Sequence, residues 1–203
     1  MGRPIPTSEI FDLTSFRSCS LKYGNMKSRR FQHVQVDNIV CGGGNDGATK
    51  KSCETFRNGE WHYSHTLLQN RSEHSVWKSP NGIILIGGED KTNYNKTEML
   101  RENGNSIESF TIDGRFAKYI HFIHFLNSFL FHFIRACSIN LGKSVILTGG
   151  NGNLVREYFE NGTNNILPKL NSKRYNHGCS SYIDSNDNEV ILLNGCLDIS
   201  EII

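Results

Sequence analysis

A pair of glycines at the end of a short apolar run occurs three times along this chain of 203 residues. The runs are rich in Val, Ile and Leu and are bounded by Gly, Asn, Asp and Pro, a composition typical of strands and turns. A fourth apolar run ends in Asn194-Gly195. The three pairs are Gly42-Gly43, Gly87-Gly88 and Gly149-Gly150.

The residues around each glycine pair recur as well. An Arg-x-x-His pattern precedes the first, second and fourth runs, and Arg135-Ala136-Cys137 stands at the third. A Glu followed by an Asn-Gly dipeptide comes after the first three runs. We interpret the chain as four copies of one unit. The recurring residues are Arg30, His33, Arg71, His74, Arg174 and His177 before the runs, and Glu54, Glu98 and Glu157 after them.

The spacing indicates which kind of repeat protein this is. Gly42 and Gly87 are 45 residues apart, Gly87 and Gly149 are 62 apart, and Gly149 and Asn194 are 45 apart. A period of roughly 20 to 50 residues is typical of solenoids, propellers and other arrays. The middle interval is therefore about 17 residues too long for the period.

One unit can be laid out as four strands joined by tight turns. Strands are predicted over residues 31–36, 39–41 and 53–56, and a fourth begins near Trp61. Asn58-Gly59 suits the two-residue hairpin turn whose twist matches paired strands. No helical spacing occurs in the repeats. Four antiparallel strands per repeat is the arrangement of a propeller blade.

These motifs resemble the kelch repeat family over nearly the whole chain. The similar features are the glycine pair after an apolar strand, an aromatic residue on the third strand (Phe56, Tyr158 or Phe159) and a later bulky residue (Trp61, Phe110). The departures are Leu100 for the aromatic and Asn194-Gly195-Cys196 for the last pair. WD40 repeats are disfavoured because no Trp-Asp dipeptide ends a repeat. The resemblance implies an all-β fold, a kelch-type β-propeller of about four blades of four antiparallel strands.

The predicted organisation is a single domain over residues 1–203. The partial unit at 8–21 shares Ser-Glu-Ile with residues 200–202, so we expect it either to complete the last blade or to belong to an incomplete array. A fragment of a longer protein, or a chain that assembles with another chain, are the alternatives to a closed four-bladed ring. The predicted repeats are 22–66, 67–111, 135–170 and 171–203.

The surplus length falls in a Phe-rich stretch at residues 118–134. A membrane span is rejected because His121, His124, Asn127 and His132 interrupt the stretch, which falls short of the roughly 20 apolar residues that a span needs. An amphipathic helix remains an alternative, with phenylalanines on one face. Our hypothesis is a translated intron or similar insertion, because removing the stretch restores the 45-residue interval. Mature transcripts that all keep these codons would contradict it.

No catalytic residue, cofactor site or metal site is predicted. Residues 42–47 match Gly-x-Gly-x-x-Gly, but the other copies show that the match is a product of the repeat glycines. Gly142-Lys143-Ser144 lacks the earlier glycine and the following helix of a phosphate-binding loop. His62 and His65, like the pair in the Phe-rich stretch, have no partner at zinc spacing. We expect the recurring histidines to make structural hydrogen bonds in each blade.

Composition disfavours nucleic acid as a partner but does not decide the cellular compartment. A formal net charge of +2 with mixed signs offers no footprint for nucleic acid. The first residues lack the apolar core of a signal peptide, which slightly favours a cytoplasmic location; an incomplete N-terminus would allow an extracellular one. Six cysteines are present, and their redox state stays open: Cys41 and Cys53 either bridge two strands of one blade or are buried free cysteines, which are common. Three Asn-x-Ser/Thr sequences begin at Asn70, Asn95 and Asn161; a chain of this length contains such sequences by chance, and Asn161 is expected in a tight turn.

The expected function is recognition of another protein by loops between the strands, without catalysis or membrane binding. In folds of this kind specificity lies on variable loops while the strands stay regular. The expected loops are 44–52, 89–96 and 151–154, with the connections 22–30, 66–71 and 168–174. Self-association through open blade edges, a small-molecule-binding, carbohydrate-binding or enzymatic propeller, and a gene-model fragment of a longer kelch protein without independent function are the alternatives. The candidate binding residues are Asn45, Asp46, Lys50, Glu89, Asp90, Lys91, Asn151 and Asn153; the structural repeat residues are the glycines and glutamates above, Gly195 and Trp61.

Overall fold

The protein is all-β over the residues that the structure, a computed structural model, describes. These are residues 10–12, 17–19, 25–45, 48–88, 95–112, 136–149, 152–186 and 189–197. Every strand pair within the sheets is antiparallel, and no helix occurs in these ranges. The Phe-rich stretch at 118–134 lies outside them.

The strands form sheets in which neighbours in sequence are mostly neighbours in space. The first sheet contains β3 (Val34–Val36), β4 (Ile39–Cys41), β5 (Gly44–Asn45), β6 (Ala48–Arg57) and β7 (Glu60–Arg71). The second contains β8 (Ser75–Ser79), β9 (Gly82–Ile86), β10 (Lys96–Leu100) and β11 (Ser106–Thr111). The third contains β12 (Ala136–Asn140), β13 (Ser144–Gly149), β14 (Val155–Phe159) and β15 (Asn164–Ile166). A fourth pairs β16 (Arg174–Ile183) with β17 (Glu189–Leu197), and a separate hairpin pairs β1 (Ile10–Asp12) with β2 (Arg17–Cys19).

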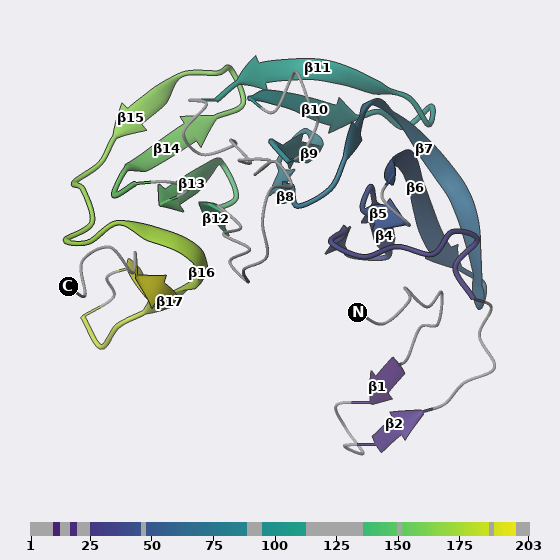
Figure 1. Ribbon diagram of the computed structural model, residues 1–203, viewed down its shortest axis with the longest axis horizontal. Helices are drawn as coiled ribbons and strands as arrows, with labels where there is room; N and C mark the ends of the chain where they lie inside the picture. Colours follow the sequence, from purple (N-terminus) through teal and green to yellow (C-terminus); the bar gives the residue numbers. More distant parts are fainter. Residues whose placement is uncertain are drawn as a thin grey trace, which may run out of the picture.

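The sheets stand side by side along an arc (Figure 1). Their first strands lie on its inner side, where β3 contacts β8, β8 contacts β12 and β12 contacts β16. The last strands, β7, β11 and β15, lie on the outer side (Figure 1). Each sheet therefore faces the next one, with its strands ordered from the inside of the arc to the outside.

Burial on both faces explains the unbroken apolar runs before the glycines. On β9, Ile84 and Ile86 pack into the cluster between the second and third sheets, whereas Leu85 packs toward the first sheet. On β13, Val145 faces the second sheet and Ile146 faces β16 and β17. Alternate residues of a strand point to opposite faces, so a strand that is covered on both sides needs apolar residues at every position.

In the first sheet the strand predictions hold at 39–41 and 53–56, whereas the strand predicted over 31–36 is limited to β3 at 34–36 because Gln32 has φ of 55°, and two predicted loops are wrong. β4 spans 39–41 as predicted, and the Asn58-Gly59 turn joins β6 to β7 with positive φ at both residues (53° and 81°). Residues 44–52 and 66–71 were wrongly predicted as loops, because the β5–β6 hairpin and the β6–β7 ladder occupy much of both ranges. Backbone hydrogen bonds continue that ladder through two register shifts, and these bonds do not require apolar side chains.

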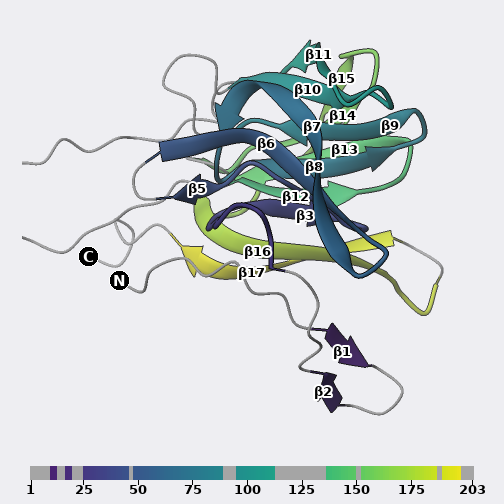
Figure 2. The same cartoon turned by 90° about the vertical axis from the view of Figure 1, so that its right-hand side faces the viewer.

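The hairpin β1–β2 forms a sheet of its own (Figures 1 and 2). Among the described strands, its pairing partners are only each other, and β17 pairs only with β16. Completion of the last unit by residues 8–21 therefore stays a prediction.

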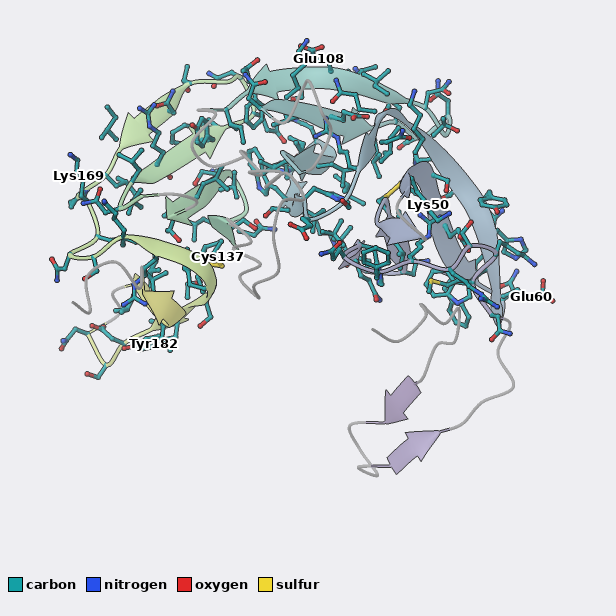
Figure 3. The ribbon with its side chains drawn as sticks, in the orientation of Figure 1. Lys50, Glu60, Glu108, Cys137, Lys169 and Tyr182 are labelled. Atoms are coloured by element: carbon teal, nitrogen blue, oxygen red, sulfur yellow. A yellow bond between two sulfur atoms is a disulfide. The ribbon has the colours of Figure 1, made fainter. Side chains whose placement is uncertain are left out.

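Two disulfides cross-link the described strands. Cys41 and Cys53 face each other on β4 and β6 and form a bridge within one unit, the first of the two alternatives that the sequence left open. Cys137 on β12 bonds to Cys179 on β16 and so joins two neighbouring sheets, a bridge that sequence spacing alone did not suggest (Figure 3).

We expect both cross-links in the protein folded under oxidising conditions. A protease digest without reductant should contain one peptide pair joined through Cys41 and Cys53 and one joined through Cys137 and Cys179. Mass spectrometry before and after reduction is the measurement. Pairs that join the four cysteines in any other way would contradict the pairing of β4 with β6 and the contact between β12 and β16.

Candidate functional site

The two ends of the sheets differ in the kind of connection they carry (Figure 2). The turn end carries short hairpin turns, such as those at 37–38, 58–59 and 80–81. The opposite end, the loop end, is where β4, β9 and β13 end and where β8 and β16 begin the next sheet. The strands that border the predicted binding loops 89–96 and 151–154 end or begin at the loop end, whereas much of 44–52 and 66–71 is strand. The loop end is therefore the candidate site.

The structure describes three of the eight candidate binding residues. The backbone of Asn45 lies in β5, and Lys50 is a half-buried residue of β6 whose N–H donates to the Gly43 carbonyl over 2.9 Å. Asn153 holds the connection after the third sheet, because its Nδ2 donates to the Leu170 carbonyl and its own carbonyl accepts from Leu170 N–H. The remaining five lie outside the described residues: Asp46, Glu89, Asp90, Lys91 and Asn151.

The first glycine of a pair packs directly against the chain that enters the next sheet. A Cβ at Gly42 would come 2.5 Å from the carbonyl oxygen of Arg71 and 2.6 Å from Cε1 of His74. The neighbouring Gly43 donates its N–H to the same Arg71 carbonyl over 2.7 Å. In the third unit Gly149 takes the equivalent place beneath His177. Gly150 lies outside the described residues. The pair thus allows one sheet to approach the next through backbone atoms.

A buried Arg–Glu pair crosses the strands behind each of the first two glycine pairs. Arg30 Nη2 lies 2.8 Å from Glu54 Oε1, and Arg71 Nε lies 2.6 Å from Glu98 Oε1, with all four side chains at most 1% exposed. Each arginine also donates to the carbonyl of the first glycine in its own unit, Gly42 or Gly87. The pairs therefore fix the strand ends that border the predicted binding loops.

The glutamates also hold the chain that enters each unit. Glu54 accepts from the backbone N–H groups of Lys27 and Ser28, over 2.6 and 2.9 Å. Glu98 accepts from Leu68 N–H and from the Ser106 hydroxyl. These extra donors satisfy the carboxylate oxygens, which is what a buried charge needs.

In the third unit Glu157 has different partners. It accepts from Ser144 Oγ over 2.6 Å and from Asn165 Nδ2 over 3.1 Å, while Arg135 lies outside the described residues. Trp61, the remaining repeat residue, is buried with Met26 and Val40, and its ring centroid lies 5.3 Å from that of Phe56. Gly195 lies opposite His177 on the β16–β17 ladder.

The recurring histidines do not share one hydrogen-bonding role. His177 Nε2 lies 2.7 Å from Thr148 Oγ1 of the neighbouring sheet, as a structural hydrogen bond requires. Neither ring nitrogen of His74 hydrogen-bonds to a protein atom, and the ring packs against Gly42 instead. The expected hydrogen bond in each blade is therefore wrong for His74. Burial, together with the charge of Arg71 and the neighbouring His33, lowers the pKa of His74 to about 3.

Stability should consequently fall in mild acid. Below its ordinary pKa of 6.5, His74 is protonated in the unfolded chain, whereas in the folded chain it stays neutral down to about pH 3. The contribution of neutral His74 to the free energy of unfolding is present above pH 6.5 and is lost as the pH falls. The loss amounts to about 2 kcal/mol between pH 7 and pH 5. Urea titrations of the wild type and of His74→Leu at both pH values measure it. An equal loss of unfolding free energy in both proteins would assign the pH dependence to other groups.

Two residues of the site were not predicted from the sequence. Gln32 and Glu73 each precede the repeat histidine and each have φ of 55°, which is uncommon for residues other than glycine. Glu73 N–H donates to the Gln32 carbonyl over 2.9 Å, and Gln32 Nε2 donates to the Glu73 carboxylate. Their shared place in Arg-x-x-His was the available signal. The contact ties the first two sheets together beside the glycine pair.

Two features are absent from the residues that the structure describes. They contain no group of three or more His, Cys, Asp or Glu side chains placed to hold a metal ion. Within the same ranges, no helix is long and apolar enough to cross a membrane. No protein-family model and no curated protein matches the chain.

Proposed function

We propose that this chain is a kelch-type β-propeller that binds another protein through its loop end and catalyses no reaction. One observation carries the proposal. The connections that follow the glycine pairs differ in length and composition between the copies, and the strands that border them end on the same side of the sheets, where buried Arg–Glu pairs fix the strand ends of the first two units. A rigid scaffold that carries variable loops is a common basis of recognition.

The propeller interpretation draws on the arc of sheets. Apart from β5, three successive sheets present their strands in chain order, with the first strand inside, and their facing surfaces bury apolar clusters. The glycine pairs and the third-strand glutamates recur in register with these sheets. This is the arrangement expected of kelch blades around a common axis.

Ring closure is part of the proposal. In the first three sheets the second strand pairs on both sides, whereas among the described strands β17 pairs only with β16. An unpaired strand edge favours association with another strand. We expect the hairpin β1–β2 to supply that strand, and self-association of two chains is the alternative route.

A photo-reactive residue at Lys50 tests the binding surface, and Glu60 is its matched control. Both side chains lie on the β6–β7 hairpin, Lys50 toward the loop end and Glu60 beside the turn at the opposite end (Figure 3). We expect a cross-linked protein adduct from position 50 and none from position 60. The captured protein, once purified, should then bind the wild-type chain in calorimetry.

Other outcomes would support other functions. Adducts from position 60 alone would move the surface to the turn end and contradict the proposal. A small molecule or metal retained by the purified chain in native mass spectrometry would favour a carbohydrate-binding or enzymatic propeller. A chain that melts cooperatively only after deletion of 118–134 would support the insertion hypothesis and would direct the binding experiment to the shorter form.

A further inference from the structure

We infer that Asn161 is an N-glycosylation site that is built to carry an oligosaccharide on the turn end of the protein. The inference does not depend on the proposed binding function. It rests on the local geometry of Asn161 and, independently, on the two disulfides, which are typical of proteins that fold in an oxidising secretory compartment.

The sequence Asn161-Gly162-Thr163 forms the turn between β14 and β15. The Asn161 carboxamide oxygen accepts from Thr163 N–H over 3.0 Å and from Thr163 Oγ1 over 2.7 Å. Both side chains are exposed. This turn brings the threonine hydroxyl to the carboxamide, so the residues that define the acceptor sequence already contact one another on the surface.

The turn is held in place by its neighbours. Gly162 N–H donates to the Phe159 carbonyl over 2.9 Å, and Phe159 N–H donates to the Thr163 carbonyl over 3.0 Å. Glu160 accepts from Asn81 of the second sheet, both from its backbone N–H and from its side chain. The acceptor is thus presented on a fixed hairpin.

In the other two acceptor sequences the third residue is buried, whereas Thr163 is exposed. Ser72, two residues after Asn70, is 2% exposed, and Thr97, two residues after Asn95, is fully buried and donates its hydroxyl to the Phe110 carbonyl. Both lie near the loop end, whereas Asn161 lies at the turn end. A glycan on Asn161 would leave the loop end uncovered.

The modification is a transfer without oxidation or reduction. Nδ2 of Asn161 forms a bond to the anomeric carbon of an oligosaccharide that is linked to a lipid diphosphate. The bond from that carbon to the diphosphate oxygen breaks, the lipid diphosphate leaves with the electron pair, and the amide nitrogen gives up one proton. The co-reactant is the lipid-linked sugar donor of the secretory compartment, and its transferase is the catalyst.

The test expresses the full chain behind a cleavable secretory leader in eukaryotic cells. Glycosidase release in ¹⁸O water followed by peptide mass spectrometry should label Asn161, and the label should disappear in Asn161→Gln and in Thr163→Val. Glu60→Thr is the matched gain-of-site variant, because it completes an Asn-Gly-Thr sequence at the equivalent turn, at Asn58.

The outcomes separate clearly. Label at Asn161 on the translocated chain, lost in both variants, supports the site whether or not the chain is secreted. A translocated chain that is unlabelled at Asn161 overturns it, as does label confined to Asn70 or Asn95. Label at Asn58 in Glu60→Thr without label at Asn161 would overturn it most directly, since the transferase would then have modified an equivalent turn and passed over this one.

Discussion

Replacing Arg71 by alanine should lower the free energy of unfolding by about 3–5 kcal/mol, because it leaves the buried carboxylate of Glu98 without its ion pair. The arginine is fully buried, and its loss also removes a donor from the Gly87 carbonyl. A buried charge that has lost its partner is one of the few causes of so large an effect. Urea unfolding followed by circular dichroism measures the change.

Lys78→Ala is the matched control for Arg71→Ala. Lys78 Nζ lies 2.8 Å from Asp37 Oδ2, but the two side chains are 58% and 54% exposed. Water screens such a pair, so its loss should cost no more than about 1 kcal/mol. Arg71→Met combined with Glu98→Leu should recover part of the stability, because it removes both charges. Equal losses for Arg71→Ala and Lys78→Ala would refute the buried pair as the element that holds these sheets.

The sequence predicted the parts of the fold that depend on short, repeated patterns. The glycine pairs, the apolar runs and Asn58-Gly59 gave the all-β class and the strand order of one unit, because backbone freedom and two-sided burial leave local traces. The 44–52 region was missed because a polar segment can form a ladder through its backbone alone. Its strand character depends on the β5–β6 hairpin and on pairing with β7.

The candidate site was predicted in outline only. Arg30, Glu54, Arg71 and Glu98 were recognised as recurring residues, but their pairing in space across 24 and 27 residues required the fold. The disulfide between Cys137 and Cys179 was missed for the same reason, since 42 residues separate the two cysteines. The hydrogen bond predicted for His74 from its repeat position was wrong, because the ring packs against the backbone of Gly42.

Gly42→Ala should lower the free energy of unfolding by about 3 kcal/mol. Gly42 has φ of 62°, where an alanine is strained by about 1 kcal/mol. The new methyl would also meet the Arg71 carbonyl at 2.5 Å and the His74 ring at 2.6 Å, and relief of such an overlap costs roughly 1–3 kcal/mol more. The obstacle includes backbone, so a change of side-chain rotamer cannot remove it. The midpoint and slope of urea unfolding give the value.

Gly142→Ala separates the two contributions to that loss. Gly142 has φ of 76°, similar to Gly42, but a Cβ there would have nothing within 4 Å. Its loss should therefore report the backbone strain alone, about 1 kcal/mol. The excess at Gly42 then measures the close approach of two neighbouring sheets. If both variants lose the same free energy of unfolding, the glycines would be required only for their backbone conformation. Packing between the sheets would then depend on the apolar clusters and the Arg–Glu pairs.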